Sequence, residues 1–270
     1  MKSLLSSFSR EIRVFLIGIF LLLLLSAKPI FCQESFYDSN PEEHKKACQG
    51  YYSLTMIKKT SSDEQWILRD KDNNIASIDL PEIPSRINLY NCVDIDNDGQ
   101  KEAIVEYYTL GAHCCFEYHI YRQEEAGLKL FERQYLGNAY APVFKDINKD
   151  GILEMLTFDD SFSYFNGLCY ACSPALPLIL CYRNKMFSDC TNEFPEIIDH
   201  AIEKTLKKKE DHELYRRGLA LQYLVLNVIG GKRELGWQGV KKYYPDSYLW
   251  LRENARDINK ILDGRKFNKR

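Results

Sequence analysis

The 270-residue chain lacks the short motifs that mark several common catalytic sites. It has no G-x-S-x-G nucleophile elbow, no H-E-x-x-H zinc helix, and neither the G-x-x-x-x-G-K-[ST] nor the G-x-G-x-x-G phosphate loop. These absences weigh against an enzyme that depends on one of those motifs. A hydrolase whose catalytic pair is distant in sequence stays open as an alternative.

The composition also lacks any extreme bias. The chain is 45% hydrophobic and 27% charged, with a formal net charge of -2. Such a mixture excludes a disordered chain, a collagen-like fibre and a membrane protein with many spans. The length is sufficient for one or two domains, with a sizeable core.

The first 32 residues have the pattern of a secretory signal peptide. Basic residues (Lys2, Arg10 and Arg13) precede an apolar run from Val14 to Ala27. Fourteen residues fit a signal peptide and fall short of the ~20 that span a bilayer. We predict cleavage near Cys32 or after Ala27, and a secreted, periplasmic or cell-envelope location. An uncleaved N-terminal anchor is the alternative.

The remaining chain divides into two regions by pattern and by charge. Residues 33–192 contain short apolar runs rich in Tyr and Phe, separated by Gly, Asn and Asp, which predicts an antiparallel β-domain. Residues 193–270 have apolar residues at helical spacing, which predicts a helical C-terminal region. The predicted class is therefore α+β. Residues 33–200 carry a net charge of -13 and residues 201–270 a net charge of +8.

Two segments within the β region repeat one acidic pattern. Residues 94–102 read Asp-Ile-Asp-Asn-Asp-Gly-Gln-Lys-Glu, and residues 146–154 read Asp-Ile-Asn-Lys-Asp-Gly-Ile-Leu-Glu. Each copy follows an apolar strand and leads to a later strand that ends in Tyr-Arg, namely Tyr121-Arg122 and Tyr182-Arg183. The chain thus contains an internal repeat, over residues 90–122 and 142–183, of the kind found in propellers and solenoids.

The spacing of the acidic residues is typical of a calcium loop. Ca²⁺ takes six to eight oxygen ligands, and oxygens at positions 1, 3 and 5 of a tight loop converge on one point. Glycine at position 6 permits the sharp reversal of the backbone. An EF-hand would need Glu at position 12, where this chain has Val105 and Thr157, and flanking helices. We therefore expect each loop to join two β-strands.

This pattern resembles the FG-GAP and related calcium-binding repeats of integrin-like β-propellers. The resemblance implies calcium bound in a β-hairpin loop, with Glu here at the position where the family commonly has Asp. Only two clear copies occur, so we expect a partial, propeller-like array, or an irregular β-domain built around the two hairpins, rather than a closed propeller. Carried over to this sequence, the implied metal ligands are Asp94, Asp96, Asp98, Glu102, Asp146, Asn148, Asp150 and Glu154.

An acidic turn whose Asp side chains bond only their own backbone is the alternative to each calcium loop. The first loop offers four carboxylates, whereas the second offers three, with Lys149 adjacent. Because affinity rises with ligand charge, we predict tighter calcium binding at the first loop.

All eight cysteines that follow the predicted signal peptide precede residue 191. An even set in an exported chain favours disulfides. Cys181 and Cys190 flank a predicted turn and suit a hairpin-closing bridge, and elimination pairs Cys48 with Cys92. For the other four, we favour bridges that tie the two repeats together. A redox pair at Cys169-x-x-Cys172, or zinc held by His113, Cys114 and Cys115, is the alternative.

These observations together favour an exported, calcium-stabilised, non-enzymatic module that binds a protein or a glycan. An extracytoplasmic enzyme, thiol-based or hydrolytic, and a structural envelope protein are the alternatives. The negative charge of the chain without its signal peptide weighs against nucleic acid as a partner. The basic tail is interpreted first as a solvated face, and contact with lipid headgroups is its functional alternative.

Overall fold

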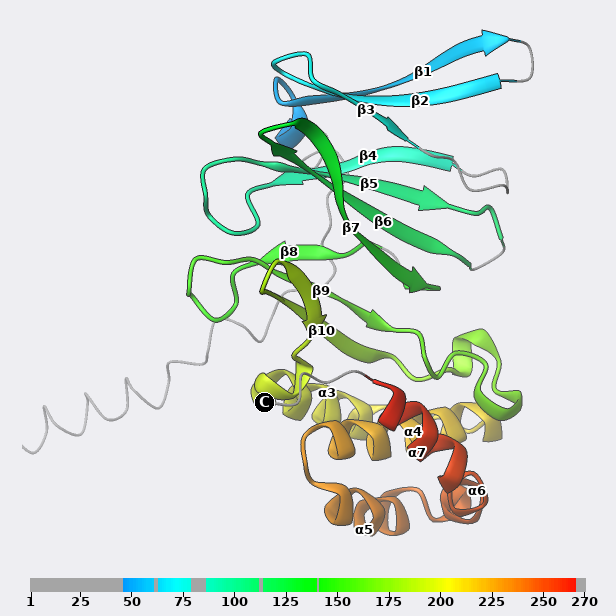
Figure 1. Cartoon of the computed structure of the whole chain (residues 1–270). Helices are drawn as coiled ribbons and strands as arrows, with labels where there is room; N and C mark the ends of the chain where they lie inside the picture. Colours follow the sequence, from blue (N-terminus) through cyan, green and yellow to red (C-terminus); the bar gives the residue numbers. More distant parts are fainter. Residues whose placement is uncertain (1–45, 61–62, 79–85, 112–113, 140, 266–270) are drawn as a thin grey trace, which may run out of the picture. The chain divides into compact units, whose positions relative to one another are not determined.

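The computed structural model describes residues 46–60, 63–78, 86–111, 114–139 and 141–265, all of which belong to one compact unit, 39–270. The predicted signal peptide, 1–32, lies outside the described residues. The predicted α+β class is confirmed, because antiparallel strands are followed by helices (Figure 1). The domain boundaries 33–192 and 193–270 stay a prediction.

Three antiparallel sheets follow one another along the chain, and in each sheet neighbouring strands are consecutive in sequence. The first sheet contains β1 (Tyr52–Thr60), β2 (Asp63–Asp70) and β3 (Ile75–Ile78). The second contains β4 (Arg86–Val93), β5 (Glu102–Tyr108), β6 (Phe116–Glu124) and β7 (Gly127–Gly137). The third contains β8 (Val143–Lys145), β9 (Glu154–Asp159), β10 (Leu176–Arg183) and β11 (Met186–Asp189).

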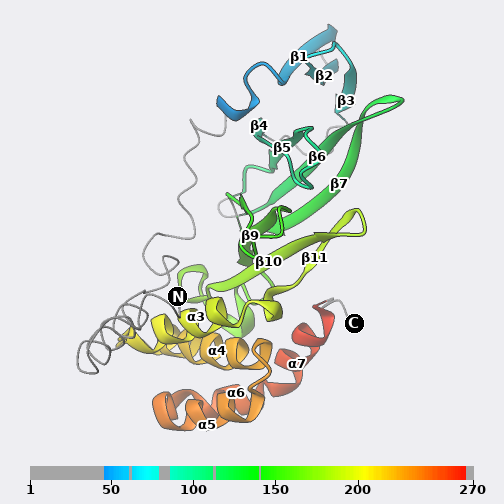
Figure 2. The same cartoon turned by 90° about the vertical axis from the view of Figure 1, so that its left-hand side faces the viewer.

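Strand β5 in the second sheet is buried on both faces, whereas antiparallel sheets commonly leave one face to solvent. In β5, Ala103 and Val105 pack in an apolar core shared with the first sheet, whereas Ile104 packs in a core shared with the third. Side chains alternate between the two faces of a strand, so one strand serves both cores. Figure 2 shows the second and third sheets in succession. The acidic repeats therefore belong to two sheets that pack against each other.

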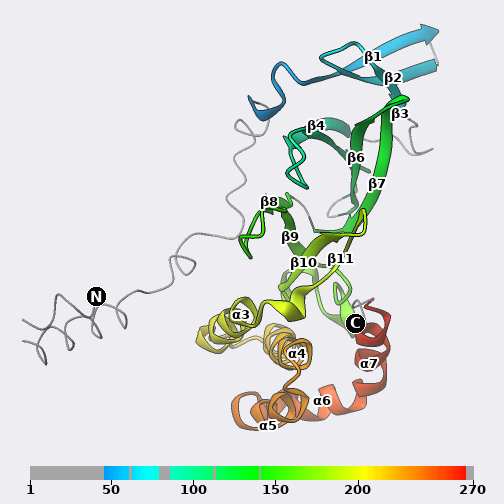
Figure 3. The ribbon, with the colours of Figure 1, turned by 60° about the vertical axis from the view of Figure 1, so that its left-hand side comes forward.

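The helical region packs on a third core built around α4. Its elements are α3 (Pro195–Lys207), α4 (Glu213–Ile229), α5 (Arg233–Tyr243), α6 (Tyr248–Glu253) and α7 (Ala255–Gly264). Helix α4 contacts α3, α5 and α6 (Figure 3). Between β9 and β10, the 3₁₀ turns η3 (Phe165–Gly167) and η4 (Tyr170–Cys172) lead the chain to this core. Among the residues described, no helix is both long enough and apolar enough to cross a membrane.

Two of the predicted disulfides are confirmed. Cys181–Cys190 closes the β10–β11 hairpin, and Cys48 pairs with Cys92. The expectation that the other four cysteines tie the repeats together is wrong, because the bridges are local: Cys114–Cys115 and Cys169–Cys172. The sulfurs of Cys114 and Cys115 are bonded to each other, so neither is a thiolate that could bind zinc as the alternative requires. His113 lies outside the described residues.

Candidate metal centre

Both acidic repeats lie in hairpin connections. The first joins β4 to β5, where Val93 pairs with Glu102, and the second joins β8 to β9, where Lys145 pairs with Glu154. The flanking elements are strands in both cases, as the sequence predicts and as an EF-hand would not allow. We call residues 94–102 the first loop and residues 146–154 the second loop.

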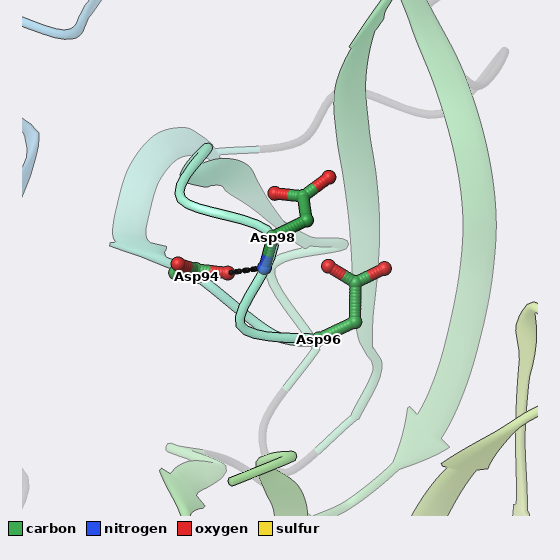
Figure 4. A group of neighbouring side chains, drawn as sticks. All are labelled: Asp94, Asp96 and Asp98. Carbon is green, nitrogen blue, oxygen red and sulfur yellow. Dashed lines mark hydrogen bonds between the residues drawn. The ribbon is translucent and has the colours of Figure 1, made fainter.

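The first loop is wound around the Asp94 carboxylate. Its two oxygens accept backbone hydrogen bonds from Asp98 (3.1 Å) and Gly99 (2.9 Å), and Figure 4 shows the bond to Asp98. The reversal places Asn97 at φ 59° and Gly99 at φ 88°, in the left-handed region where Asn and Gly are tolerated best. One carboxylate oxygen each of Asp94, Asp96 and Asp98 lies within 4.8 Å of the others. The first loop thus brings together three of its four predicted ligands.

The fourth predicted ligand, Glu102, lies behind the loop in a buried ion cluster. Its side chain is 0% exposed; Oε2 accepts a hydrogen bond from the Ile95 backbone N–H (2.9 Å) and Oε1 accepts one from Arg122 Nε (2.8 Å). The same guanidinium reaches Asp96 Oδ2 at 2.8 Å. Arg122 therefore links the third and ninth positions of the first loop.

Burial controls the protonation of this cluster. Desolvation raises the pKa of Glu102 to about 7, although the hydrogen bond from Ile95 and the Arg122 charge pull it down. Burial alone would lower the pKa of Arg122, but the Glu102 carboxylate and other neighbouring groups, among them Asp96, outweigh it and raise that pKa. The guanidinium also lies over the rings of Phe131 (4.6 Å) and Tyr182 (5.6 Å). It is a largely buried positive charge, 14% exposed, that contacts Asp96 and Glu102.

One oxygen of this cluster has no partner. Asp96 Oδ2 contacts Arg122, whereas Asp96 Oδ1 is buried and accepts no hydrogen bond from any described residue. A buried carboxylate oxygen without a partner is costly, and a bound cation is one of the ways in which such an atom is satisfied. The orphan oxygen belongs to the same loop as the Asp94 and Asp98 carboxylates.

The second loop repeats the backbone of the first. Asp146 accepts hydrogen bonds from the N–H groups of Asp150 (3.2 Å) and Gly151 (3.0 Å), and Lys149 and Gly151 have φ of 64° and 90°. Glu154 accepts a bond from the backbone N–H of Ile147 (2.9 Å), which matches the bond from Ile95 to Glu102. The repeated sequence therefore folds into a repeated hydrogen-bond pattern.

The second loop differs in what surrounds its ninth position. Asn148 Nδ2 donates to Asp150 Oδ2 (2.9 Å) and to Glu154 Oε1 (3.2 Å), in the place that Arg122 takes in the first loop. Glu154 is buried, and desolvation raises its pKa. The second loop thus uses a neutral amide where the first uses a buried cation.

The repeat pattern does not single out Arg122, because the two Tyr-Arg pairs look equivalent in the sequence. The ladders show that they are not. Tyr121 pairs with Ala103, but its counterpart opposite Met155 is Leu180, so Arg183 lies two residues beyond the position of Arg122. Arg183 instead forms a double ion pair with Glu193, at 2.7 and 2.8 Å. The signal that could have pointed to Arg122 was Glu102, because a buried carboxylate needs a partner.

The two loops touch each other. The Leu153 N–H donates to the Ile95 carbonyl (2.8 Å), and a Cβ added to Gly151 would lie 3.3 Å from Asn97 Nδ2. The stems of the first loop are also anchored: the Cys48–Cys92 bridge ends two residues before Asp94. Both loops are consequently preorganised, which lowers the entropy that a ligand would otherwise have to overcome.

Comparison with known proteins gives one distant relative and no family. The chain is 26% identical over 240 residues to a probable thylakoid lumen protein of Synechocystis sp., covering 83% of this chain and 70% of the relative. No family model matches the chain. No solved structure matches it either.

Proposed function

We propose that this chain is an exported, calcium-binding module that binds a protein or a glycan outside the cytoplasm. In this proposal the two calcium loops have no catalytic role. The observation that carries the proposal is the orphan Asp96 Oδ1 beside the Asp94 and Asp98 carboxylates. Oxygen-only donor sets of this kind suit a hard divalent cation such as Ca²⁺. The FG-GAP resemblance gives the same metal for the same residues.

The proposed ligands are those that the repeat pattern implies. In the first loop Asp94, Asp96 and Asp98 supply side-chain oxygens without rearrangement of the loop. Glu102 contributes directly only if it gives up one of its contacts with Arg122 and Ile95. If it keeps those contacts, Glu102 holds the loop backbone and neutralises the charge of Arg122. Calcium at this loop therefore competes with Arg122 for Asp96, and for Glu102 as well if that residue binds.

In the second loop the proposed ligands are Asp146, Asn148, Asp150 and Glu154. The Asn148 amide group donates its Nδ2 protons to Asp150 and Glu154, while Asn148 Oδ1 accepts the Asp150 N–H (2.9 Å). Calcium binding would turn this amide so that its oxygen faces the ion. The second site therefore requires a side-chain rearrangement that the first does not.

An exported location has three supports. The apolar segment at Val14–Ala27 has the length and flanks of a signal peptide. The relative in Synechocystis sp. carries the name of a thylakoid lumen protein, and that lumen lies outside the cytoplasm. Four disulfides agree with an oxidising compartment.

The test is calcium titration by calorimetry of the chelator-treated chain and of single variants. Asp94→Asn and Asp98→Asn should each weaken the first site, and Asp146→Asn and Asp150→Asn the second. Asp72→Asn is the matched control, because Asp72 lies in the acidic β2–β3 turn outside both loops and is exposed. It should leave calcium binding unchanged.

Two results would refute the proposal. One is the absence of calcium-dependent heat and of any calcium-dependent rise in melting temperature. The other is a loss of binding in Asp72→Asn as large as in Asp98→Asn, which would show diffuse attraction to an acidic surface rather than a site.

A further inference from the structure

The Cys169–Cys172 disulfide differs in exposure from the Cys48–Cys92 and Cys181–Cys190 bridges. Cys169 is exposed and Cys172 is buried, whereas both sulfur-bearing residues of Cys48–Cys92 and of Cys181–Cys190 are 3% exposed or less. The two cysteines are three residues apart, and the bridge closes the 3₁₀ turn η4. One residue of this pair is thus exposed while its partner is buried.

The backbone around the pair directs a hydrogen-bond donor at the exposed sulfur. The Cys172 N–H lies 3.1 Å from Cys169 Sγ, within hydrogen-bond distance for sulfur. Such a donor stabilises a thiolate on Cys169 more than a neutral thiol, because bonds to the charged form favour it. A stabilised, accessible thiolate is what a reactive cysteine requires.

The turn is held by bonds that do not depend on the disulfide. Ser173 Oγ donates to the Cys169 carbonyl (2.9 Å) and accepts the Tyr164 N–H (2.9 Å). The Cys172 carbonyl packs against helix α4 at Gly218, where an added Cβ would lie 1.8 Å from the carbonyl oxygen. Reduction therefore leaves the two sulfurs close together, in a segment that can form the bridge again.

A cavity of about 220 Å³ adjoins this segment. Its lining includes Tyr170, which lies between the two cysteines, and Ser173, which follows them. Asn138 lines the same cavity, and its Oδ1 is buried and accepts no hydrogen bond from a described residue. The cavity thus lies next to the turn that carries the disulfide, although neither cysteine lines it.

We propose that Cys169–Cys172 is a redox-active disulfide that exchanges with the dithiol of a partner polypeptide. A partner thiolate attacks Cys169 Sγ; a mixed disulfide forms, and the Cys172 sulfur leaves as a thiolate and takes a proton. The partner's second thiol loses its proton and attacks the partner's own sulfur in the mixed disulfide, which releases Cys169. Two electrons pass from the dithiol, which becomes a disulfide, to the Cys169–Cys172 pair, which becomes two thiols.

This activity is independent of the calcium loops, since none of the proposed ligands lines the cavity or belongs to the turn. Asp160, which lies in the cavity wall, accepts hydrogen bonds from Asn138 at 2.9 and 3.0 Å and is outside both loops. Success or failure of either proposal therefore leaves the other standing.

The first experiment is a redox titration of the unaltered chain in buffers of reduced and oxidised dithiothreitol. Samples are quenched with acid, alkylated with a maleimide, and read peptide by peptide by mass spectrometry. Cys169 and Cys172 should become alkylated at a less reducing poise than Cys48, Cys92, Cys181 and Cys190. Reduction of Cys169–Cys172 together with or after the two buried pairs would overturn the proposal.

The second experiment compares single variants by the rate of reaction with an aromatic disulfide reagent. Cys172→Ser leaves the exposed Cys169 thiol, and Cys169→Ser leaves the buried Cys172 thiol. The first should react at least about tenfold faster, because access and thiolate character both favour it. Cys190→Ser, which frees the buried Cys181, is the matched control and should react as slowly as Cys169→Ser. Equal rates for Cys169 and Cys172 would contradict the proposal.

Two arms identify the source of the thiol. The oxidised chain is mixed with a reduced peptide that contains two cysteines, or with glutathione at equal thiol concentration. The proposed dithiol exchange predicts one peptide disulfide formed per chain and little reaction with glutathione. Equal reaction with both would assign the site to small thiols and overturn the polypeptide partner.

Discussion

The first and second loops have the same backbone and different charges around it. In both, the Asp at position 1 accepts the N–H groups of positions 5 and 6, and the Glu at position 9 accepts the N–H of position 2. Among the described residues, only the first loop has an arginine, the largely buried Arg122, on its carboxylates. Loop geometry is therefore encoded locally, whereas the electrostatic environment comes from a distant strand.

The comparison also explains why the two arginines that follow the repeats have separate roles. Arg122 lies in β6, contacts Glu102 and is 14% exposed. Arg183 lies in β10, two residues beyond the position that corresponds to Arg122, and it pairs with Glu193 near solvent. A pair in a low-dielectric site interacts more strongly and is more costly to break than one in water. The difference between the loops should therefore appear first in stability.

Substitution of Arg122 should have the largest effect of the changes considered. Arg122→Gln leaves Glu102 and Asp96 without their cation and should lower the free energy of unfolding by about 3 kcal/mol. The exposed counterpart, Arg183→Gln, should lower it by about 1 kcal/mol or less. Urea unfolding in the presence of a chelator measures both without calcium. Equal losses would show that burial does not distinguish the two ion pairs.

Calcium should have the next largest effect. A ligand at 100 times its dissociation constant stabilises the folded state by about 2.7 kcal/mol, which raises the melting temperature of a domain of this size by roughly 5–10 °C. Differential scanning calorimetry with calcium and then with excess chelator measures the shift. Asp98→Asn should remove more of it than Asp150→Asn. A shift that survives both substitutions would place the calcium elsewhere.

The order of the two affinities is the next expectation. The first loop has four carboxylates and one adjacent guanidinium, and the second has three carboxylates and Lys149. We expect the first site to bind calcium about tenfold more tightly, because affinity follows ligand charge. Calorimetry on Asp150→Asn reports the first site alone, and on Asp98→Asn the second alone. The reverse order would mean that competition from Arg122 outweighs the extra carboxylate.

The smallest effect should come from an exchange at position 4. Asn97 and Lys149 both have positive φ, a conformation that Asn adopts more readily than Lys. Lys149→Asn also removes a positive charge and should strengthen the second site, and Asn97→Lys should weaken the first. We expect each change to be about threefold, since an exposed charge changes binding by less than ~1 kcal/mol. Changes of the same sign in both variants would rule out this electrostatic reading.

Much of the fold was predictable because its signals are local. Short apolar runs rich in Tyr and Phe predicted the strands, and the helical spacing of apolar residues over 193–270 predicted helices such as α3 and α4. The last helical segment is divided at Asn254, between α6 and α7, where the backbone leaves helical geometry. Helix α5 has few apolar residues, and among its residues only Gly236, Gly239 and Val240 are buried.

The amino-acid sequence by itself determined the two acidic loops. The Asp side chains at positions 1 and 5 accept backbone N–H groups of the loop, and Gly at position 6 permits the chain reversal, all within nine residues. Only the tertiary structure decided which charges surround them. Arg122 reaches Glu102 through the register of β5 on β6, and register depends on the packing of whole strands. The pairing of Cys169 with Cys172 was likewise decided by the turn between β9 and β10, since cysteine spacing alone allows many partners.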